Sequence, residues 1–360
     1  MKIGILTFHL VPNYGAVLQA FALMDFLRRK GHDAFIVDYR CPGNNDAYSP
    51  KNQYSLKRVR HALKSYVYFF IMLVLSKNSY VKKFNAFETF QKKFFNLIDL
   101  KDSSLDVVFC GSDQIWNPSI TKGMDKFFFG LHDSCINSKK IAYAASCGDV
   151  NSLSSEEKEL MVSYAKQMDA VSVRESPLNV FLTKKGVASE VVLDPVFLLS
   201  KNDYIKHFYD ESFNEQEYVL VYELHEVPLI RPVVKAIAKE KNLKVIYVCG
   251  YKKMKFFCHD HIYTAGPEDF ITYVANAKYV VTNSFHGLAF SLIFEKDFNV
   301  CLPKVRAERL TNLLDSVGLS NRVVTQVDSI NTQQIDYNQV SRKKNELIEL
   351  SKKFIEKALM

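Results

Sequence analysis

One histidine lies where a predicted buried strand gives way to a helix. The β-branched run 280–282 is followed by Asn283 and Ser284, and an apolar helix begins at Phe285, so that His286 falls in its first turn. Backbone N–H groups at a helix N-terminus lack partners within the helix and attract anions. An imidazole changes charge near neutral pH, so this position suits proton transfer to an anionic substrate. Alternatively, Asn283 or Ser284 caps the helix and His286 only fills space.

Basic side chains elsewhere in the chain could bind that anion. Arg174 ends another predicted strand, and a basic cluster follows the last long strand: Lys304, Arg306 and Arg309. Arginine binds a carboxylate through two hydrogen bonds from its guanidinium, and both lysine and arginine neutralise the charge of a phosphate. If two halves of the chain face each other across a cleft, these side chains meet His286. Alternatively, Arg174 and Glu175 form a surface ion pair, and the cluster is the solvated start of a helix.

A polar loop, residues 111–117, follows the strand predicted at 106–110. It holds Asp113 and several groups suited to carbohydrate: Gln114, Trp116 and Asn117. Carboxylates and amides bind sugar hydroxyls, and an indole packs on a sugar ring. Asp113 could also accept a hydroxyl proton as general base. The alternative is an Asn-Pro turn in which the tryptophan is part of the core.

A second loop, after the strand predicted at 2–8, lies at the same edge of the sheet. It could add polar contacts to the cleft through four residues: Asn13, Tyr14, Gly15 and Gln19. Gly15 could instead only permit a tight turn. The loop has one glycine, so a dinucleotide-binding fingerprint is absent.

The order of predicted elements indicates α/β architecture. The opening strand, a helix over 16–29 and a strand over 34–39 form a βαβ unit, which implies a parallel sheet. Further strands are expected at 106–110, 140–145, 170–173, 191–193, 218–222, 244–248, 279–282 and 298–301, and helices at 154–167, 229–240, 268–276, 285–294, 306–316 and 339–358. Several strands of the first half end in polar residues, as in Asp194-Pro195. We therefore predict two Rossmann-like domains facing across a cleft.

The domain boundaries follow from composition and length. We expect an N-terminal, acceptor-side domain over 1–200, a polar linker over 200–216, and a C-terminal, donor-side domain over 214–335. A helix within 339–360 should close back on the N-terminal domain. The N-terminal domain carries a basic, aromatic helical insertion at 51–96.

Charge and cysteine content restrict the classes of partner. The net charge is +8, from 47 basic and 39 acidic residues, which favours anionic partners. There is no zinc finger, RNP-like motif or Arg-rich arm, so nucleic acid is not indicated. Seven cysteines without CxxC spacing fit reduced thiols in the cytosol. Cys258, His259 and His261 lack a fourth ligand at a standard spacing, and we predict no metal.

The insertion has an uncharged stretch at 66–75, too short to span a bilayer. Basic residues flank it on both sides: Lys57, Arg58, Arg60, Lys64, Lys77, Lys82 and Lys83. An interfacial helix on the inner membrane face is one interpretation, and a core helix with solvated basic ends is the other. The N-terminus has no signal peptide pattern, so the expected location is cytoplasmic, with peripheral membrane contact as an option.

Five segments together resemble the polysaccharide pyruvyl transferase family. They are residues 13–20, 111–117, 172–175, 194–195 and 282–287, and they occur in family order over nearly the whole chain. The resemblance implies a fold like the B-type glycosyltransferases. It implies phosphoenolpyruvate as donor substrate, with no cofactor, and a sugar acceptor with two hydroxyls, on a lipid-linked repeat unit of capsule or exopolysaccharide.

The resemblance also implies roles for individual residues. Arg174 and His286 match the family's essential arginine and histidine, and Lys304 or Arg306 its distal basic residue. Ser284, Phe285 and Gly287 would lie at the donor. Many members have Arg-Leu-His or similar where this chain has Ser284-Phe285-His286, which leaves more of the donor's charge to Lys304, Arg306 or Arg309. Acceptor contacts would come from Glu175 and the two loops described above. The alternatives are a nucleotide-sugar glycosyltransferase of the same fold and a non-catalytic carbohydrate- or phosphate-binding protein.

Overall fold

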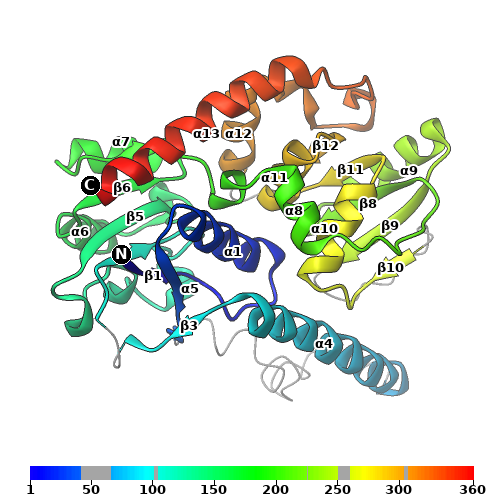
Figure 1. Cartoon of the computed structure of the whole chain (residues 1–360). Helices are drawn as coiled ribbons and strands as arrows, with labels where there is room; N and C mark the ends of the chain where they lie inside the picture. Colours follow the sequence, from blue (N-terminus) through cyan, green and yellow to red (C-terminus); the bar gives the residue numbers. More distant parts are fainter. Residues whose placement is uncertain (42–65, 101–103, 225, 250–259, 304–306) are drawn as a thin grey trace.

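The computed structural model describes residues 1–41, 66–100, 104–224, 226–249, 260–303 and 307–360. Two β-sheets, each covered by helices, lie next to each other (Figure 1). All strand pairs in both sheets are parallel. The predicted α/β class with two Rossmann-like halves is confirmed.

The N-terminal sheet has seven strands in the order β3-β2-β1-β4-β5-β6-β7. In chain order they are β1 (Lys2–Leu6), β2 (Asp33–Val37), β3 (Leu97–Ile98), β4 (Val107–Cys110), β5 (Lys139–Ala145), β6 (Ala170–Val173) and β7 (Glu190–Val191). The order reverses between β1 and β4, and open α/β sheets bind ligands at the strand carboxyl ends beside such a switch point. The loops after β1 and β4 therefore flank the expected binding edge.

The C-terminal sheet has six strands in the order β10-β9-β8-β11-β12-β13. They are β8 (Tyr218–Glu223), β9 (Lys244–Cys249), β10 (Asp260–Ile262), β11 (Tyr279–Thr282), β12 (Asp297–Cys301) and β13 (Val323–Val324). Here the switch point lies between β8 and β11. His286 follows β11 and so lies at the switch point of the second sheet.

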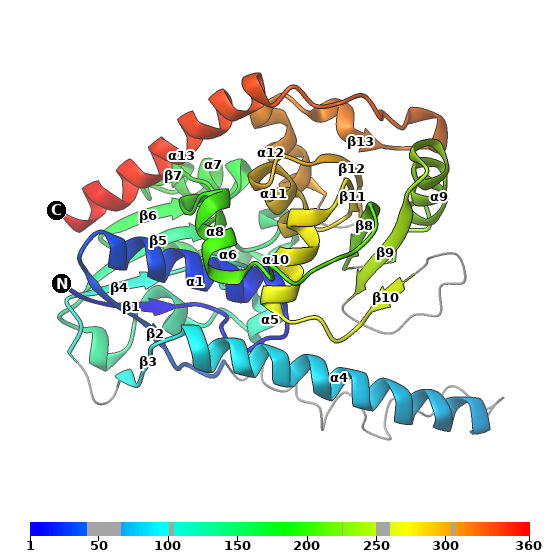
Figure 2. The same cartoon turned by 45° about the vertical axis from the view of Figure 1, so that its right-hand side comes forward.

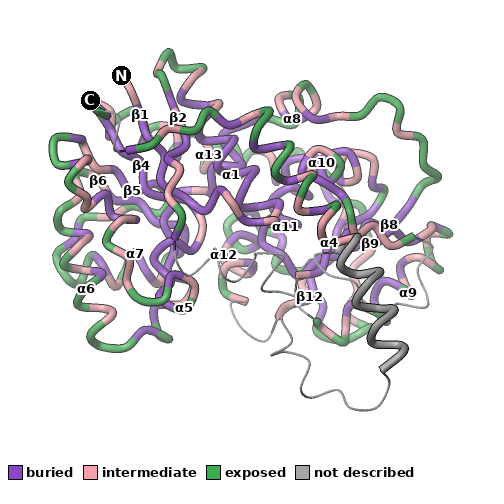
Figure 3. Tube along the Cα trace, turned by 90° about the horizontal axis from the view of Figure 1, so that it is seen from below, coloured by how far each residue is buried: buried purple, intermediate pink, exposed green. Residues whose placement is uncertain are grey.

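Helices connect the strands and cover both sheets. They are α1 (Tyr14–Arg29), α4 (Tyr66–Phe94), α5 (Pro118–Thr121), α6 (Ser155–Ala165), α7 (Ser176–Lys184), α8 (Lys201–Phe208), α9 (Ile230–Lys241), α10 (Pro267–Asn276), α11 (Phe285–Ile293), α12 (Glu308–Val317) and α13 (Tyr337–Leu359). A capping box begins α6, because Ser154 and Glu157 each accept a hydrogen bond from the other's backbone N–H. Figure 3 shows α1 and α11 largely buried, whereas α6 is exposed along much of its length.

The first half of the polar segment 200–216, expected as a linker, forms the helix α8. Ser200 and Asp203 make a capping box that starts this helix. Tyr204 and Phe208, one turn apart, are buried and pack on Phe290 and Phe21, respectively. Two apolar residues at i and i+4 were enough to bury a face of an otherwise polar helix.

Helix α4 packs along both halves of the molecule (Figure 2). Lys83 is 2% exposed, and its ammonium lies 4.6 Å from the centroid of the Tyr14 ring. Lys93 forms an ion pair with Glu268 of the C-terminal half at 2.8 Å. Lys83 therefore does not face a membrane, contrary to the interfacial interpretation of that residue. Its ammonium is buried against the Tyr14 ring, in a cation–π contact. Residues 51–65 of the insertion lie outside the described residues.

None of the helices within the described ranges is long and apolar enough to cross a bilayer.

The last helix, α13, returns from the C-terminal half to the N-terminal half (red in Figure 1). Ser351 accepts a hydrogen bond from the Leu193 N–H at 2.9 Å, and Lys30 pairs with Glu356 at 2.7 Å. One apolar cluster includes residues of both halves and of this helix. The prediction that the C-terminal helix closes back on the N-terminal domain is confirmed.

Candidate active site

His286 stands in the first turn of α11, directly after β11. Ser284 is the N-cap, and its Oγ accepts a hydrogen bond from the Gly287 N–H at 3.4 Å. A Cβ on Gly287 would come within 2.2 Å of Thr282 Oγ1, so glycine lets the chain turn from strand to helix without a clash. Ser284 thus caps the helix, as one interpretation held, and this tight junction fixes the base of the His286 side chain.

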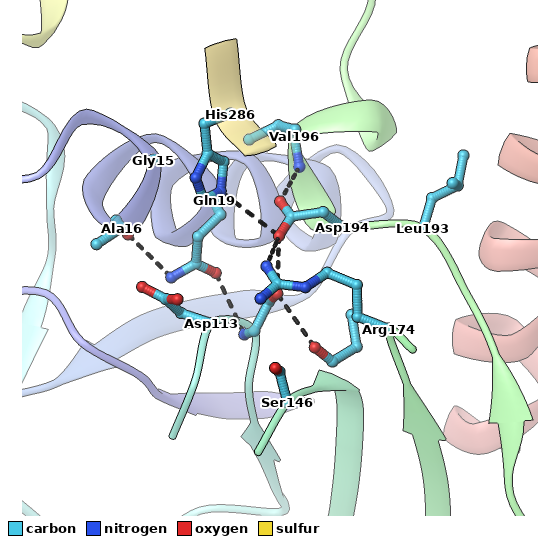
Figure 4. Close-up of polar contacts among 12 residues, drawn as sticks. Gly15, Ala16, Gln19, Asp113, Ser146, Arg174, Leu193, Asp194, Val196 and His286 are labelled. Carbon is cyan, nitrogen blue, oxygen red and sulfur yellow. Dashed lines mark hydrogen bonds and ion pairs between the residues drawn. The ribbon is translucent and has the colours of Figure 1, made fainter. Parts of the chain in front are cut away.

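The His286 side chain points out of the C-terminal half toward the end of β7 in the N-terminal half (Figure 4). Its Nε2 lies 3.6 Å from Asp194 Oδ2. The same oxygen accepts hydrogen bonds from Arg174 Nη1 at 2.7 Å and from Ser112 Oγ at 3.0 Å. His286, Asp194, Arg174 and Ser112 are all buried. The structure thereby brings Arg174 and His286 together, as the sequence predicts.

A second carboxylate lies on the other side of the guanidinium. Glu175 Oε1 accepts hydrogen bonds from Arg174 Nε at 3.3 Å and from Ser146 Oγ at 2.7 Å. The Arg174 and Glu175 side chains are only 2% and 8% exposed, so the surface ion-pair interpretation is wrong. Arg174 Nη2 and Glu175 Oε2 are buried and make no hydrogen bond within the described part of the chain. Buried polar atoms are normally paired, so both are available to a ligand.

Neighbouring charged side chains of this site shift the pKa values of Arg174 and Asp194. Burial alone would lower the pKa of Arg174, but the carboxylates of Glu175, Asp194 and Asp113 raise it above its usual value. Burial would raise the pKa of Asp194, but His286 and Arg174 lower it below its usual value. At neutral pH the cluster therefore carries a fixed cation beside a fixed anion.

Asp113 lies close to the guanidinium and on the same side of α1 (Figure 4). It is half-buried, has a φ of 69° in the loop after β4, and is close enough to contribute to the raised pKa of Arg174. One of its oxygens accepts a hydrogen bond from the Gln114 N–H at 2.8 Å. Asp113, Arg174, Glu175 and His286 thus gather at the edge of the N-terminal sheet.

Gly15 makes this arrangement possible from the opposite side. It has ordinary helical backbone in the first turn of α1, so the interpretation as a tight-turn residue is wrong. A Cβ at this position would lie 1.9 Å from His286 Nδ1. The absent side chain gives the imidazole its room against the N-terminal half.

Three other residues predicted to bind the acceptor are occupied by the fold. Gln19 is fully buried and donates to Thr7 Oγ1 and the Ala16 carbonyl. Tyr14 is 1% exposed, stacks on Phe270 and donates its hydroxyl hydrogen to a carbonyl of the C-terminal half. Asn13 caps α1. These residues hold the two halves and the first helix in place; the sequence pattern located the right edge but not this role.

The tryptophan loop is also structural at three of its positions. Trp116 is fully buried, stacks on Phe129 and donates to the Phe128 carbonyl. Its indole therefore offers no face to a sugar, and the core interpretation is confirmed for it. Gln114 and Asn117 are buried and hydrogen-bonded to each other at 2.8 Å. Within this loop Asp113 remains half-exposed at the site.

A cavity of about 110 Å³ adjoins Arg174 between the two halves. Phe285, Asp194 and Arg309 contribute to its lining, and the Phe285 ring lies 4.8 Å from the Arg174 guanidinium carbon. Phe285 thus covers the buried cation. Two members of the predicted basic cluster lie outside the described residues: Lys304 and Arg306.

No group of residues in the described ranges is arranged to hold a metal ion. Cys258 and His259 fall outside those ranges.

Sequence reasoning assigned no role to three residues of the cluster: Ser112, Ser146 and Asp194. Asp194 did carry a signal, because it follows a predicted strand, as the other polar strand endings do. Ser112 lies in the loop after β4, where the larger polar side chains attracted the assignment. Ser146 had no signal of its own, since only the fold places its hydroxyl beside Glu175.

Solved structures show the class of fold. AviGT4, a glycosyltransferase involved in avilamycin A biosynthesis, has a TM-score of 0.50 and 11% identity, with 99% of this chain and 97% of that chain covered. The S. aureus MnaA–UDP co-structure has a TM-score of 0.49 and 15% identity, with 97% and 88% covered. At such identities the first likeness shows the fold alone: the two-domain architecture of B-type glycosyltransferases.

The family follows from the sequence. The model of the polysaccharide pyruvyl transferase family matches residues 13–302, most of the chain. The chain belongs to this family, and the resemblance noted in the sequence is confirmed. The matched range contains Gly15, Asp113, Arg174, Asp194 and His286. No curated protein is similar enough in sequence to count as a relative.

Proposed function

We propose that the protein transfers the pyruvyl group of phosphoenolpyruvate to two hydroxyls of a sugar, forming a pyruvate ketal and releasing phosphate. The observation that carries the proposal is the buried Arg174 guanidinium, whose Nη2 has no hydrogen-bond partner among the described residues. It lies beside a histidine that the opposite half supplies. A fixed cation next to a proton donor suits an anionic substrate that must be protonated on carbon.

The reaction begins at the donor's methylene carbon. His286, as imidazolium, gives this carbon a proton, and C2 becomes an oxocarbenium-like centre. An acceptor hydroxyl attacks C2 and loses its proton to a carboxylate, for which Asp113 and Glu175 are the candidates at the site. The bond from C2 to the phosphate oxygen breaks, and the second hydroxyl closes the ketal. In the balance, one hydroxyl proton ends on the new methyl group and the other leaves with phosphate.

Charge decides how the donor is oriented. Arg174 Nη2 would bind the carboxylate. Arg309 lines the adjoining cavity, and together with the N-terminus of α11 it would bind the phosphate. Sugar hydroxyls would meet Glu175 Oε2 and Asp113.

Calorimetric titration with phosphoenolpyruvate tests the donor without knowledge of the acceptor. Arg174→Lys keeps a cation between Asp194 and Glu175 but removes the unpaired nitrogen, and we expect affinity to fall about 10–100-fold. Arg322→Lys is the matched control, because Arg322 is also buried and donates to the Asn331 and Gln333 carbonyls. Saturable binding of a UDP- or GDP-sugar in place of phosphoenolpyruvate would overturn the donor assignment.

Turnover separates the enzyme from a binding protein. His286→Gln should bind phosphoenolpyruvate within a few-fold of wild type but release phosphate about 10²–10⁴-fold more slowly in the presence of acceptor. Wild-type binding without phosphate release over a panel of polysaccharide precursors would indicate a non-catalytic protein.

The proposed membrane contact rests on the sequence of the 51–96 insertion, whereas the lipid-linked acceptor rests on the family resemblance. Flotation with anionic vesicles tests the membrane contact, using a variant in which the uncharged stretch 66–75 is made polar. Equal recovery of variant and wild type would reject membrane contact through this segment.

A further inference from the structure

Asp194 connects the two halves of the molecule at the site. It is fully buried, and its two oxygens meet four different segments of the chain. Oδ1 accepts a hydrogen bond from the Val196 N–H at 3.1 Å. Oδ2 meets Arg174 after β6, Ser112 after β4, and His286 in α11 of the opposite half. One carboxylate oxygen therefore joins the anion-binding arginine to the proposed acid.

The hydrogen bonds fix both the orientation and the charge of this carboxylate. A buried carboxylate is costly unless it is paired, and Arg174, Ser112 and Val196 supply three donors. The Val196 bond also caps the 3₁₀ turn Pro195–Leu198, which prevents the carboxyl group from rotating freely. An anion so held presents the same oxygen to the imidazole whenever the two halves meet.

The charges around His286 make this oxygen necessary. The Arg174 cation lies on the far side of Asp194, and the other nearby carboxylates, Glu175 and Asp113, face Arg174. Without the Asp194 charge, an imidazolium at position 286 would face Arg174 with no anion between them. A like charge nearby disfavours the charged form of a titratable group, here the imidazolium of His286.

We propose that Asp194 is a positioning residue that holds His286 in its protonated, proton-donating state and sets the orientation of its ring across the junction between the halves. The inference rests on the proposed function, in which His286 is the acid. In this role Asp194 acts through His286 and not on the substrate directly. Because it also holds Arg174, a single carboxylate aligns the donor's anion site with the group that protonates the donor.

The test is Asp194→Asn, which keeps shape and removes charge. The alkaline limb of the pH–kcat profile should move to lower pH by about one unit or more, because the acid loses its proton more easily. The matched control is Asp297→Asn: Asp297 accepts a hydrogen bond from the Ile335 N–H away from the site, and its loss should leave the limb in place. An unmoved limb in Asp194→Asn would overturn the proposal.

A double-mutant cycle separates this role from a purely structural one. In a His286→Gln background, Asp194→Asn should reduce kcat by much less than it does in the wild type, because only its contact with Arg174 is then left to lose. The same large loss in both backgrounds would mean that Asp194 acts only by holding the fold, and the proposal would fail.

Two further measurements keep the test sharp. The first is nuclear magnetic resonance of histidine labelled at Cε1, which needs no substrate; the His286 signal is assigned as the one missing in His286→Gln. Asp194→Asn should move the midpoint of the His286 titration to lower pH. An unchanged midpoint would reject the inference even if the proposed reaction were correct. Should Asp194→Asn fail to fold, Asp194→Glu keeps the anion for Arg174 but displaces it by one methylene. Its kcat should fall tenfold or more, and unchanged kcat would count against positioning.

Discussion

Replacing Gly15 with alanine tests the contact between the two halves most directly. The added Cβ would lie 1.9 Å from His286 Nδ1, 2.2 Å from its Cγ and 2.3 Å from its Cε1, whereas ordinary contact begins near 3.4 Å. Either the ring or α1 must move by about 1.5 Å, the difference between these distances. The buried ring, already facing Asp194 at 3.6 Å, has little space in which to do so.

The expected cost has two opposing parts. Overpacking of a buried contact costs about 1–3 kcal/mol, while alanine in place of glycine in a helix returns about 0.5–1 kcal/mol. Net destabilisation of about 1–2 kcal/mol should appear in urea unfolding. A displaced imidazole should also lower turnover about 100-fold or more, since misplacement of a reacting group by about 1 Å has that effect.

A cycle with His286→Ala isolates the clash. Gly15→Ala should destabilise the wild type but leave His286→Ala unchanged or slightly more stable, which gives a coupling free energy of about 1–3 kcal/mol. Equal effects in the two backgrounds, or a Gly15→Ala protein with wild-type stability and turnover, would refute the view that the missing side chain makes room for the imidazole.

Three further predictions concern other residues. Trp116 is the sole tryptophan and fully buried, so acrylamide should quench its fluorescence weakly and sugar acceptors should leave its emission unchanged; strong quenching by either would contradict the burial. Tyr14→Leu should destabilise the protein by about 2–3 kcal/mol in urea, because the Phe270 stacking and a buried hydrogen bond are lost, whereas Tyr14→Phe should cost only about 1 kcal/mol. Burial lowers the pKa of Lys296 from 10.5 to about 8; between these values the unfolded chain binds the extra proton, so stability should rise with pH. This rise should be absent in Lys296→Met, and identical slopes would reject the assignment.

The strand-to-helix junctions were predictable because local signals and burial agree there. The β-branched run before Ser284, the cap itself and the apolar helix after it all point to one structure, and β11 and α11 begin and end within a residue of expectation. The same holds for the capping box of α6. Each of these features depends on residues close together in sequence.

The roles of individual polar residues were less predictable, because they depend on contacts between distant segments. Gln19 and Trp116 have side chains suited to binding sugar, yet both donate their hydrogen bonds to other buried groups of the protein. Asp194 has an unremarkable local sequence, and its importance comes from Ser112, Arg174 and His286, which approach from three other strands' ends. The type of a side chain shows which groups it can bind, but not which of those groups the fold places next to it.

The course of α13 has a consequence for synthesis on the ribosome. Phe354 and Ile355 near the C-terminus share an apolar cluster with Tyr143 and Val192 of the N-terminal half, and Ser351 binds the backbone next to β7. Domains usually fold as soon as they emerge, the first before the last. Here the first domain leaves the ribosome with this apolar face uncovered and acquires its cover only after α13 has been synthesised, so nascent chains stalled before residue 337 should bind chaperones that recognise apolar surface.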